Sequence, residues 1–345
     1  METNPTVVFT SIGNIELMDK PIPKMKSDNV LIETLVSQIS IGTEMAILLK
    51  ENVPTGSSWD IYGTYPFNAG YTNIGKVVDV GDEIDKSWIG KTVCNYGLHS
   101  RYNVTDLAHI YKIPEGIDHD QALFFTMSEV AMNGIRRAKV SWGDKIVIYG
   151  AGIIGQLVAR YCSLAGADCV IVVDVSNYRL SKLENIKNII TVNSQEQDVV
   201  PIVQEHTKNR MADIVFEVTG FAALIPEEIK ALKRLGKFII LSSPKGKTLF
   251  DFHDLCNGPS IKIIGAHNFS HPLVEEEENQ WTKARDAEFF FDLITKKSLD
   301  LSNLVTHRVP YFRAVEMYKM LINNRKEILG IHLYWTDENQ RKVGA

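Results

Sequence analysis

The sequence is poor in cysteine and has no long hydrophobic run. Only 4 of its 345 residues are cysteines, and they are scattered without a CxxC pair. Neither a disulfide framework nor a structural zinc knot is therefore indicated. No apolar stretch approaches the ~20 residues that span a bilayer. Residues 1–5 lack the basic and then apolar pattern of a signal peptide. We expect a cytoplasmic protein with reduced thiols and no membrane partner.

Basic runs with interleaved aromatic residues are also missing, which argues against nucleic acid as a partner. The net charge of −5, with 45% hydrophobic and 23% charged residues, is typical of a soluble globular protein. The length allows two domains of ordinary size, each with its own core.

What the sequence does contain is a glycine-rich turn, residues 150–155, directly after an apolar strand at 145–149. The first glycine, Gly150, permits a tight turn. Gly152 lets backbone N–H groups approach a pyrophosphate, and Gly155 lets the following helix pack closely on the strand. The alternative is a glycine-rich turn that binds nothing. As a dinucleotide site, the turn would contact the cofactor through Gly150, Gly152, Ile153, Ile154 and Gly155.

A second apolar strand, residues 169–173, ends in Asp174. A dinucleotide fold places a carboxylate here, where it accepts hydrogen bonds from both adenosine ribose hydroxyls of NAD and repels the 2′-phosphate of NADP. Arg179 is the one feature that can be interpreted the other way, since a cation near the 2′ position holds that phosphate in NADP enzymes. We expect NAD(H).

Strands and helices alternate from residue 145 to 264, which predicts a doubly wound parallel sheet of six strands. The segment before residue 93 is different: its short strands are broken by prolines and glycines, as in a small β-rich barrel. Other expected elements are helices over 119–138, 227–234, 282–294 and 312–323 and a closing strand over 331–335.

This order of elements resembles the medium-chain dehydrogenase/reductase superfamily. The segments that carry the resemblance are residues 77–81, 90–93, 150–155, 216–220 and 235–237. The resemblance implies an α/β protein with a GroES-like β-rich catalytic domain over 1–126 and 267–345. A Rossmann domain with the six-stranded sheet would occupy 127–266. It also implies a homodimer, formed where the strand at 261–264 or its neighbour extends the sheet across a twofold axis.

Zinc alcohol dehydrogenases of this superfamily hold a catalytic metal at three positions, which are Ile41, Tyr71 and a residue near Thr126 in this chain. None is a good zinc ligand, because a tetrahedral Zn²⁺ site needs nitrogen, sulfur or carboxylate donors. We therefore expect no catalytic zinc. Residues 40–44 and 70–75 look like a less common zinc-free group that includes the hydroxyethyl dehydrogenase of bacteriochlorophyll synthesis and some sugar and cyclitol dehydrogenases.

Without a metal, the proton of the reacting alcohol needs a general acid or base. Tyr71 is the first candidate, since it takes the place of the family's substrate-facing histidine; the alternative is a tyrosine that fills space. Thr43 matches the family's proton-passing hydroxyl, or is an ordinary helix-start threonine. Glu129 and Asn133 share a helix face with Thr126. The alternative for Glu129 is a salt bridge to Arg136 or Arg137, or a solvated edge.

Two histidines are weaker catalytic candidates, His99 and His267, which we place near the rim of a cleft. The resemblance makes His267 a cofactor contact, and places Arg179 on the adenine face. It implies further cofactor contacts at Val218, Thr219 and Ser242.

These observations favour an NAD-dependent enzyme that interconverts a secondary alcohol and a ketone on a polar, polyol, sugar or cyclitol-like small molecule. One alternative is a zinc-free enoyl or quinone reductase that adds hydride to a conjugated C=C. A second is a protein that keeps the nucleotide fold without turnover.

Overall fold

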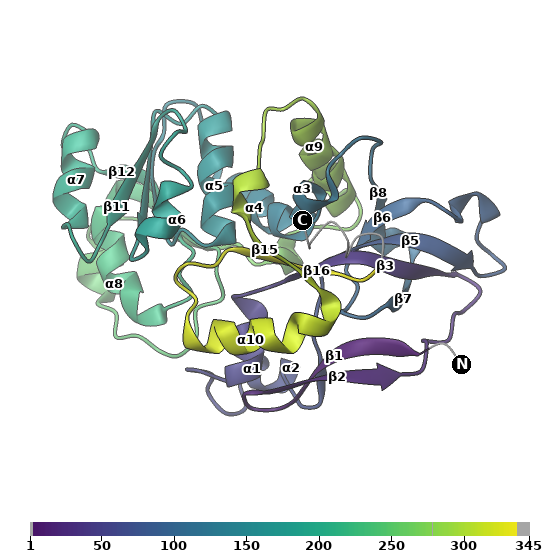
Figure 1. Cartoon of the computed structure of the whole chain (residues 1–345). Helices are drawn as coiled ribbons and strands as arrows, with labels where there is room; N and C mark the ends of the chain where they lie inside the picture. The colour runs from purple at the N-terminus through teal and green to yellow at the C-terminus, as the bar shows by residue number, and fades with distance from the viewer. Residues whose placement is uncertain (1–2, 278, 337–345) are drawn as a thin grey trace. The chain divides into compact units, whose positions relative to one another are not determined.

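The computed structural model describes residues 3–277 and 279–336 (Figure 1). Met1 and Glu2, which belong to the segment that we examined for a signal peptide, lie outside these ranges. The chain forms two compact units, Met1–Thr126 with Ala287–Ala345, and Met127–Asp286. The return to the first unit thus comes at 287 instead of the expected 267. The intervening segment is tied to the second unit, where Asn133 donates to the His267 carbonyl and Arg136 pairs with Asp286.

The second unit contains the expected six-stranded parallel sheet, in the order β11-β10-β9-β12-β13-β14. Its central strands are runs of β-branched and aromatic residues buried on both faces, which is typical of a parallel sheet covered by helices. The strands are β9 (Lys145–Tyr149), β10 (Cys169–Asp174), β11 (Ile189–Asn193), β12 (Ala212–Glu217), β13 (Leu232–Ile240) and β14 (Lys262–Gly265). The helices are α4 (Phe125–Ala138), α5 (Ile153–Leu164), α6 (Asn177–Ser181), α7 (Val199–His206) and α8 (Ile225–Glu228).

The prediction of a helix over 227–234 is wrong. Helix α8 ends at Glu228, a 3-10 turn follows, and strand β13 already begins at Leu232. Leu232 pairs with Ala212 of β12, and its side chain belongs to the core of the sheet. Pairing and burial have therefore overridden the local helical tendency of this segment.

The first unit is built from a three-stranded sheet, β2-β1-β4, and a seven-stranded sheet in which β15-β16-β3-β5-β6-β8 are neighbours and β7 pairs with β3. The closing strand β16 is confirmed: it pairs antiparallel with β3. The strands are β1 (Asn4–Ser11), β2 (Asn14–Lys20), β3 (Asn29–Ile39), β4 (Phe67–Asn68), β5 (Asn73–Val80), β6 (Thr92–Asn95), β7 (Tyr102–Asp106), β8 (Ile110–Lys112), β15 (Val305–Pro310) and β16 (Gly330–Tyr334).

The helices of this unit are α1 (Thr43–Leu49), α2 (Ser58–Tyr62), α3 (His119–Ala122), α9 (Lys283–Thr295, with its first turn in the second unit) and α10 (Ala314–Asn323). Where the sequence predicted one helix over 119–138, the structure has two helices, α3 and α4. Helix α10 contacts α1 and β2, and its Tyr318 is fully buried with Phe9 and Ile47 in one hydrophobic cluster. Within the described ranges, no helix combines the length and apolar character that crossing a bilayer requires.

Candidate functional site

The glycine turn has the geometry that a dinucleotide site needs. Gly150 has a φ of +106°, a conformation that side chains rarely adopt. A Cβ on Gly155 would lie 1.8 Å from the carbonyl oxygen of Gly150, so only glycine lets α5 approach β9 this closely. Gly152 differs, because a Cβ there would point into open space. The backbone at the start of α5 is thus accessible, with Ile153 and Ile154 in its first turn.

Helix α5 is 12 residues long and begins at Ile153. Its N-cap residue, Gly152, has no side chain that could cap the helix. Its first N–H groups are among those that have no intrahelical partner. Together with the helix dipole, such groups attract an anion, and the pyrophosphate of a dinucleotide fits this position.

The carboxylate of Asp174 is fixed at the end of β10. Its Oδ2 accepts a hydrogen bond from the Ala151 N–H (2.6 Å), and its Oδ1 accepts one from the Ser176 N–H (2.9 Å). A carboxylate can accept about four hydrogen bonds, so lone pairs remain for ribose hydroxyls. Arg179 follows on α6, where the Ser176 hydroxyl accepts from its N–H (3.3 Å). The sequence-predicted residues Asp174 and Gly150–Gly155 are therefore brought together.

A buried carboxylate that we did not single out organises the next loop. Glu217 ends β12 and is fully buried. Its Oε1 accepts from the N–H and the hydroxyl of Thr219 (2.7 Å each) and from the Gly220 N–H (2.8 Å). Its Oε2 accepts from the hydroxyl of Ser242. Glu217 therefore positions two of the predicted cofactor contacts, Thr219 and Ser242. The adjacent Val218 donates its N–H to the Tyr149 carbonyl (3.0 Å).

A second buried carboxyl, Glu228, lies at the end of α8, and neither of its oxygens has a hydrogen-bond partner among the described residues. Burial, together with the negative charge of Glu217, raises the pKa of Glu228 to about 9. A carboxyl whose folded-state pKa exceeds its unfolded value binds its proton more tightly in the native protein. The native state therefore loses stability as the pH rises from about 4.5 towards 9.

Replacing Glu228 with glutamine should remove this pH dependence. We expect Glu228→Gln to increase the free energy of unfolding by on the order of 3 kcal/mol at pH 7 and to have little effect near pH 4.5. The matched control is Glu227→Gln, an exposed neighbour that pairs with Lys230. Denaturant titrations of both variants at several pH values would measure the effect. A pH-independent difference between Glu228→Gln and the parent protein would contradict it.

In the first unit, two hydroxyl groups lie close to the phenol of Tyr71, the leading catalytic candidate. The phenolic oxygen of Tyr71 lies 2.5 Å from the Ser40 hydroxyl and 3.4 Å from that of Thr43. Ser40 directly follows β3, Thr43 begins α1, and Tyr71 lies between β4 and β5. The structure thus places Tyr71 and Thr43 together, as the sequence predicted, and adds Ser40.

Burial raises the pKa of Tyr71 to about 12, although the hydrogen bonds to Ser40 and Thr43 lower it. The charge of Glu44 and the Tyr62 phenol oppose its ionisation further. Tyr71 is therefore a neutral phenol near pH 7. It can donate a proton or a hydrogen bond to an oxygen atom, but it is not a resident base.

A polar network behind this cluster anchors helix α1. The buried carboxylate of Glu44 accepts from the Tyr318 hydroxyl (2.5 Å) and lies 3.2 Å from Nε2 of His99. Nδ1 of His99 is 2.8 Å from the Ser37 hydroxyl, which also accepts from Nε1 of Trp335 (2.9 Å). His99 is fully buried, so its expected place at a rim is wrong. The His99 ring can be buried because Ser37 and Glu44 supply hydrogen-bond partners for both of its nitrogens.

The candidates on α4 are buried. Glu129 is 1% and Asn133 2% exposed. The Asn133 amide donates to the carbonyl oxygen of His267 (3.2 Å) and to the Ser270 hydroxyl (3.1 Å). Asn133 therefore holds the loop that carries His267, and His267 itself is exposed. This contact makes Asn133 a support for a predicted cofactor residue.

The three positions where the family binds zinc do not fit the metal. Ile41 packs against a hydrophobic cluster, and Tyr71 is hydrogen-bonded to Ser40. Thr126 offers only a buried hydroxyl. Over the residues that the structure describes, no group of three or more His, Cys, Asp or Glu side chains is arranged to hold a metal ion. We assign no chemical step to zinc.

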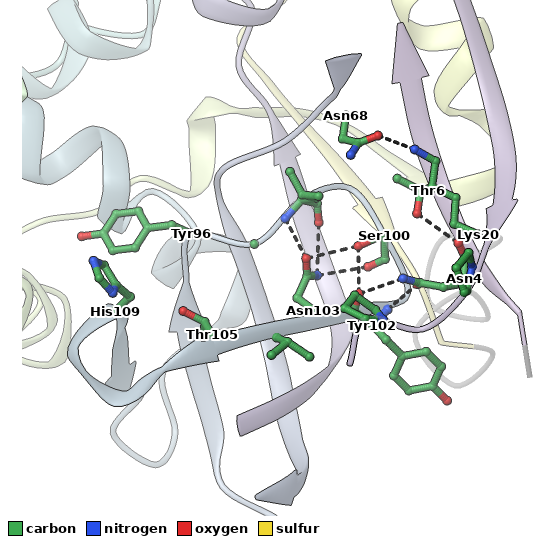
Figure 2. Close-up of a pocket in the computed structure, with 15 residues that line it drawn as sticks. Asn4, Thr6, Lys20, Asn68, Tyr96, Ser100, Tyr102, Asn103, Thr105 and His109 are labelled. Atoms are coloured by element: carbon green, nitrogen blue, oxygen red, sulfur yellow. Dashed lines mark hydrogen bonds between the residues drawn. The ribbon is translucent and has the colours of Figure 1, made fainter. Parts of the chain in front are cut away.

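A cavity of about 390 Å³ in the first unit is separate from the Tyr71 cluster. Figure 2 shows that its polar side chains are largely bonded to the protein itself. The Asn4 amide, for example, pairs with the backbone of Tyr102, and Lys20 donates to Asn68. Neither Tyr71 nor Ser40 lines it, and we give it no part in the site.

Comparisons with known proteins show similarity to dehydrogenases. Residues 154–285 match the zinc-binding dehydrogenase family. Sorbitol dehydrogenase 1 of Saccharomyces cerevisiae is 23% identical over 368 aligned positions, which cover 95% of this chain and 97% of the relative.

Two solved structures show the same fold. One is described as a zinc-binding dehydrogenase from Sinorhizobium meliloti 1021 bound to NADP (TM-score 0.80, 18% identity, 97% of this chain and 100% of that one). The other is an alcohol dehydrogenase from Escherichia coli CFT073 complexed with NADH (TM-score 0.77, 14% identity, 96% and 99%). The chain is therefore similar, over nearly its whole length, to dehydrogenases of the zinc-type alcohol dehydrogenase-like kind.

Proposed function

We propose that the protein is an NAD(H)-dependent, zinc-independent oxidoreductase that interconverts a secondary alcohol and a ketone on a polar, polyhydroxylated small molecule. The observation that carries the proposal is the neutral Tyr71 phenol, hydrogen-bonded to Ser40 where the family has a zinc ligand. The relatives support an oxidoreductase, and the sorbitol dehydrogenase among them acts on a polyol.

A bound nicotinamide supplies or accepts the hydride. Gly150–Gly155 would hold its pyrophosphate and Asp174 its ribose, for the reasons given above. Tyr71 would donate to the carbonyl oxygen as negative charge develops there, which is the task that zinc performs in metal-dependent relatives. Thr43 would hydrogen-bond the substrate or pass its proton outward.

The alternatives predict different products. An enoyl or quinone reductase would saturate a conjugated C=C, and a binding protein would bind the nucleotide without turnover. The cluster of Tyr71, Thr43 and Ser40 favours C–O chemistry, because a developing alkoxide needs hydrogen-bond donors. A panel of polyols, cyclitols, ketoses and conjugated enones, followed by nicotinamide absorbance and product analysis, separates the three. Loss of an enone C=C without action on any alcohol or ketone would overturn the proposal.

Activity should survive strong chelators. We expect the purified protein to hold no stoichiometric zinc and to keep its full rate in EDTA or phenanthroline, because Ile41, Tyr71 and Thr126 supply none of the donors that zinc prefers. Elemental analysis and chelator assays measure this. One tightly bound zinc per chain whose removal abolishes turnover would refute it.

We also propose a homodimer. Strand β14 is an edge of the six-stranded sheet, and Ile263 on it is 40% exposed. An edge strand presents unpaired backbone N–H and C=O groups, with which the same strand of a second copy can pair across a twofold axis. Light scattering at micromolar concentration should give twice the monomer mass, and Ile263→Lys should reduce it towards the monomer mass. A monomeric parent protein would contradict the prediction.

A further inference from the structure

In the cluster of Tyr71, Thr43 and Ser40, the hydroxyl of Ser40 is the one that lies closer to the Tyr71 phenol. Its hydroxyl is 2.5 Å from the phenolic oxygen of Tyr71, whereas the hydroxyl of Thr43 is 3.4 Å away. Ser40 is only 6% exposed, so bulk water does not compete freely for this contact. Ser40 and Tyr71 are therefore a directly coupled pair.

Each hydroxyl of this pair carries one proton, which restricts what it can do. A Tyr71 phenol that donates to Ser40 has no proton left for a substrate. When Ser40 donates to Tyr71 instead, the phenolic proton, which Tyr71 donates to the Thr43 hydroxyl over 3.4 Å in the structure, can turn from that long contact to a carbonyl oxygen. Donation to the phenolic oxygen also stabilises negative charge there, which is why the Ser40 contact lowers the pKa of Tyr71 against the larger rise that burial causes.

The position of Ser40 is fixed by the surrounding fold. Its carbonyl oxygen accepts from the Glu44 N–H (2.9 Å) at the start of α1. The Glu44 carboxylate is held in turn by Tyr318 and His99. The backbone of Ser40 is thus held between β3 and α1, which places its hydroxyl within reach of Tyr71.

We propose that Ser40 is a positioning residue that acts through Tyr71: its hydroxyl donates to the phenolic oxygen, directs the Tyr71 proton towards the substrate oxygen and stabilises the phenolate that remains. This inference rests on the proposed function. During reduction the Tyr71 O–H bond breaks and an O–H bond forms on the former carbonyl oxygen. The carbonyl carbon receives the hydride from the reduced nicotinamide, which is oxidised, and solvent returns a proton to Tyr71.

A double-mutant cycle tests this coupling. Ser40→Ala should lower kcat by about 10- to 100-fold, the scale of a hydrogen bond to a charged group, with KM nearly unchanged. In a Tyr71→Phe background the same substitution should have no further effect. Ser40→Thr, which keeps the hydroxyl, should restore most of the rate. The control is Ser128→Ala, which removes a serine 2.5 Å from the buried Tyr161 hydroxyl in the other unit. An equal loss from Ser40→Ala in both backgrounds would refute the proposal.

A measurement without turnover separates this inference from the proposed function. Difluorotyrosine at position 71, followed by ¹⁹F NMR across pH, reports the ionisation of that phenol directly. We expect Ser40→Ala to lower the acid ionisation constant of the phenol at position 71 about tenfold, which means a higher pKa. Ser128→Ala should leave this constant unchanged. The other titratable groups that act on Tyr71 are Glu44, Tyr62 and Tyr318, and none of these is altered. The same midpoint of the ¹⁹F pH titration in the parent and in Ser40→Ala would overturn the proposal. A shifted midpoint in a protein that turns over nothing would overturn the proposed function alone.

Discussion

Substituting Tyr71 with phenylalanine should lower turnover by roughly 10²- to 10⁴-fold, the usual range for the loss of a general acid. The substitution removes one oxygen atom and keeps the ring, so the packing of the loop between β4 and β5 is retained. Nucleotide affinity should be unchanged, because the residues that would bind the dinucleotide belong to the other unit. Steady-state kinetics with a substrate from the panel, together with NADH titration by fluorescence, would measure both effects.

Tyr161→Phe is the matched control for that experiment. The hydroxyl of Tyr161, like that of Tyr71, lies 2.5 Å from a serine, and burial raises the pKa of both phenols. Both substitutions therefore remove a hydroxyl from a Tyr–Ser pair, but only Tyr71 has a proposed chemical role. A wild-type rate in Tyr71→Phe would assign the proton transfer elsewhere, and Glu129 would be the next residue to replace. Equal losses in the two variants would indicate a structural effect.

The nucleotide half of the molecule was the part that local sequence patterns predicted best. Its central strands β9, β10 and β12 are largely apolar runs of five or six residues. The glycine turn has few alternatives, because Gly150 is required by its φ and Gly155 by close packing. The boundary of β13 was missed. Strand β13 begins at Leu232 because this residue pairs with β12. A contact between residues this far apart in the chain cannot be predicted from a local sequence pattern.

The catalytic half was predicted less completely. The family resemblance pointed to Tyr71 and Thr43, but nothing local distinguished Ser40 from other serines after a strand. Its contact with Tyr71 spans 31 positions and exists only in the folded chain. His99 was misplaced for the same reason, since its partners Ser37 and Glu44 are 62 and 55 residues away. A buried Glu217 was also missed, although an acid at the end of an apolar strand, as at Asp174, was the available signal.

We expect Asp174 to set the preference of the protein for NAD over NADP. Its carboxylate is held by the N–H groups of Ala151 and Ser176, so it cannot swing away from a 2′-phosphate without losing two hydrogen bonds. At an effective dielectric constant of about 20, a like-charge contact at ~4 Å costs on the order of 4 kcal/mol. After screening by solvent and salt we still expect at least a tenfold preference for NAD over NADP in kcat/KM.

Removing that charge should show its role. In Asp174→Ala, NAD should bind much more weakly and NADP relatively better, so that the preference falls or reverses. Asp174→Asn removes the charge with less change of shape and should relax the preference in the same direction. Asp168→Ala is the control, because it removes a carboxylate just before the opposite end of the same strand, where it pairs with Lys145. The ratio of kcat/KM with NAD to kcat/KM with NADP should be the same in Asp168→Ala as in the parent protein. Equal kcat/KM for NAD and NADP in the parent protein would refute the assigned role of Asp174, and Arg179 would then be the cation that accepts the 2′-phosphate.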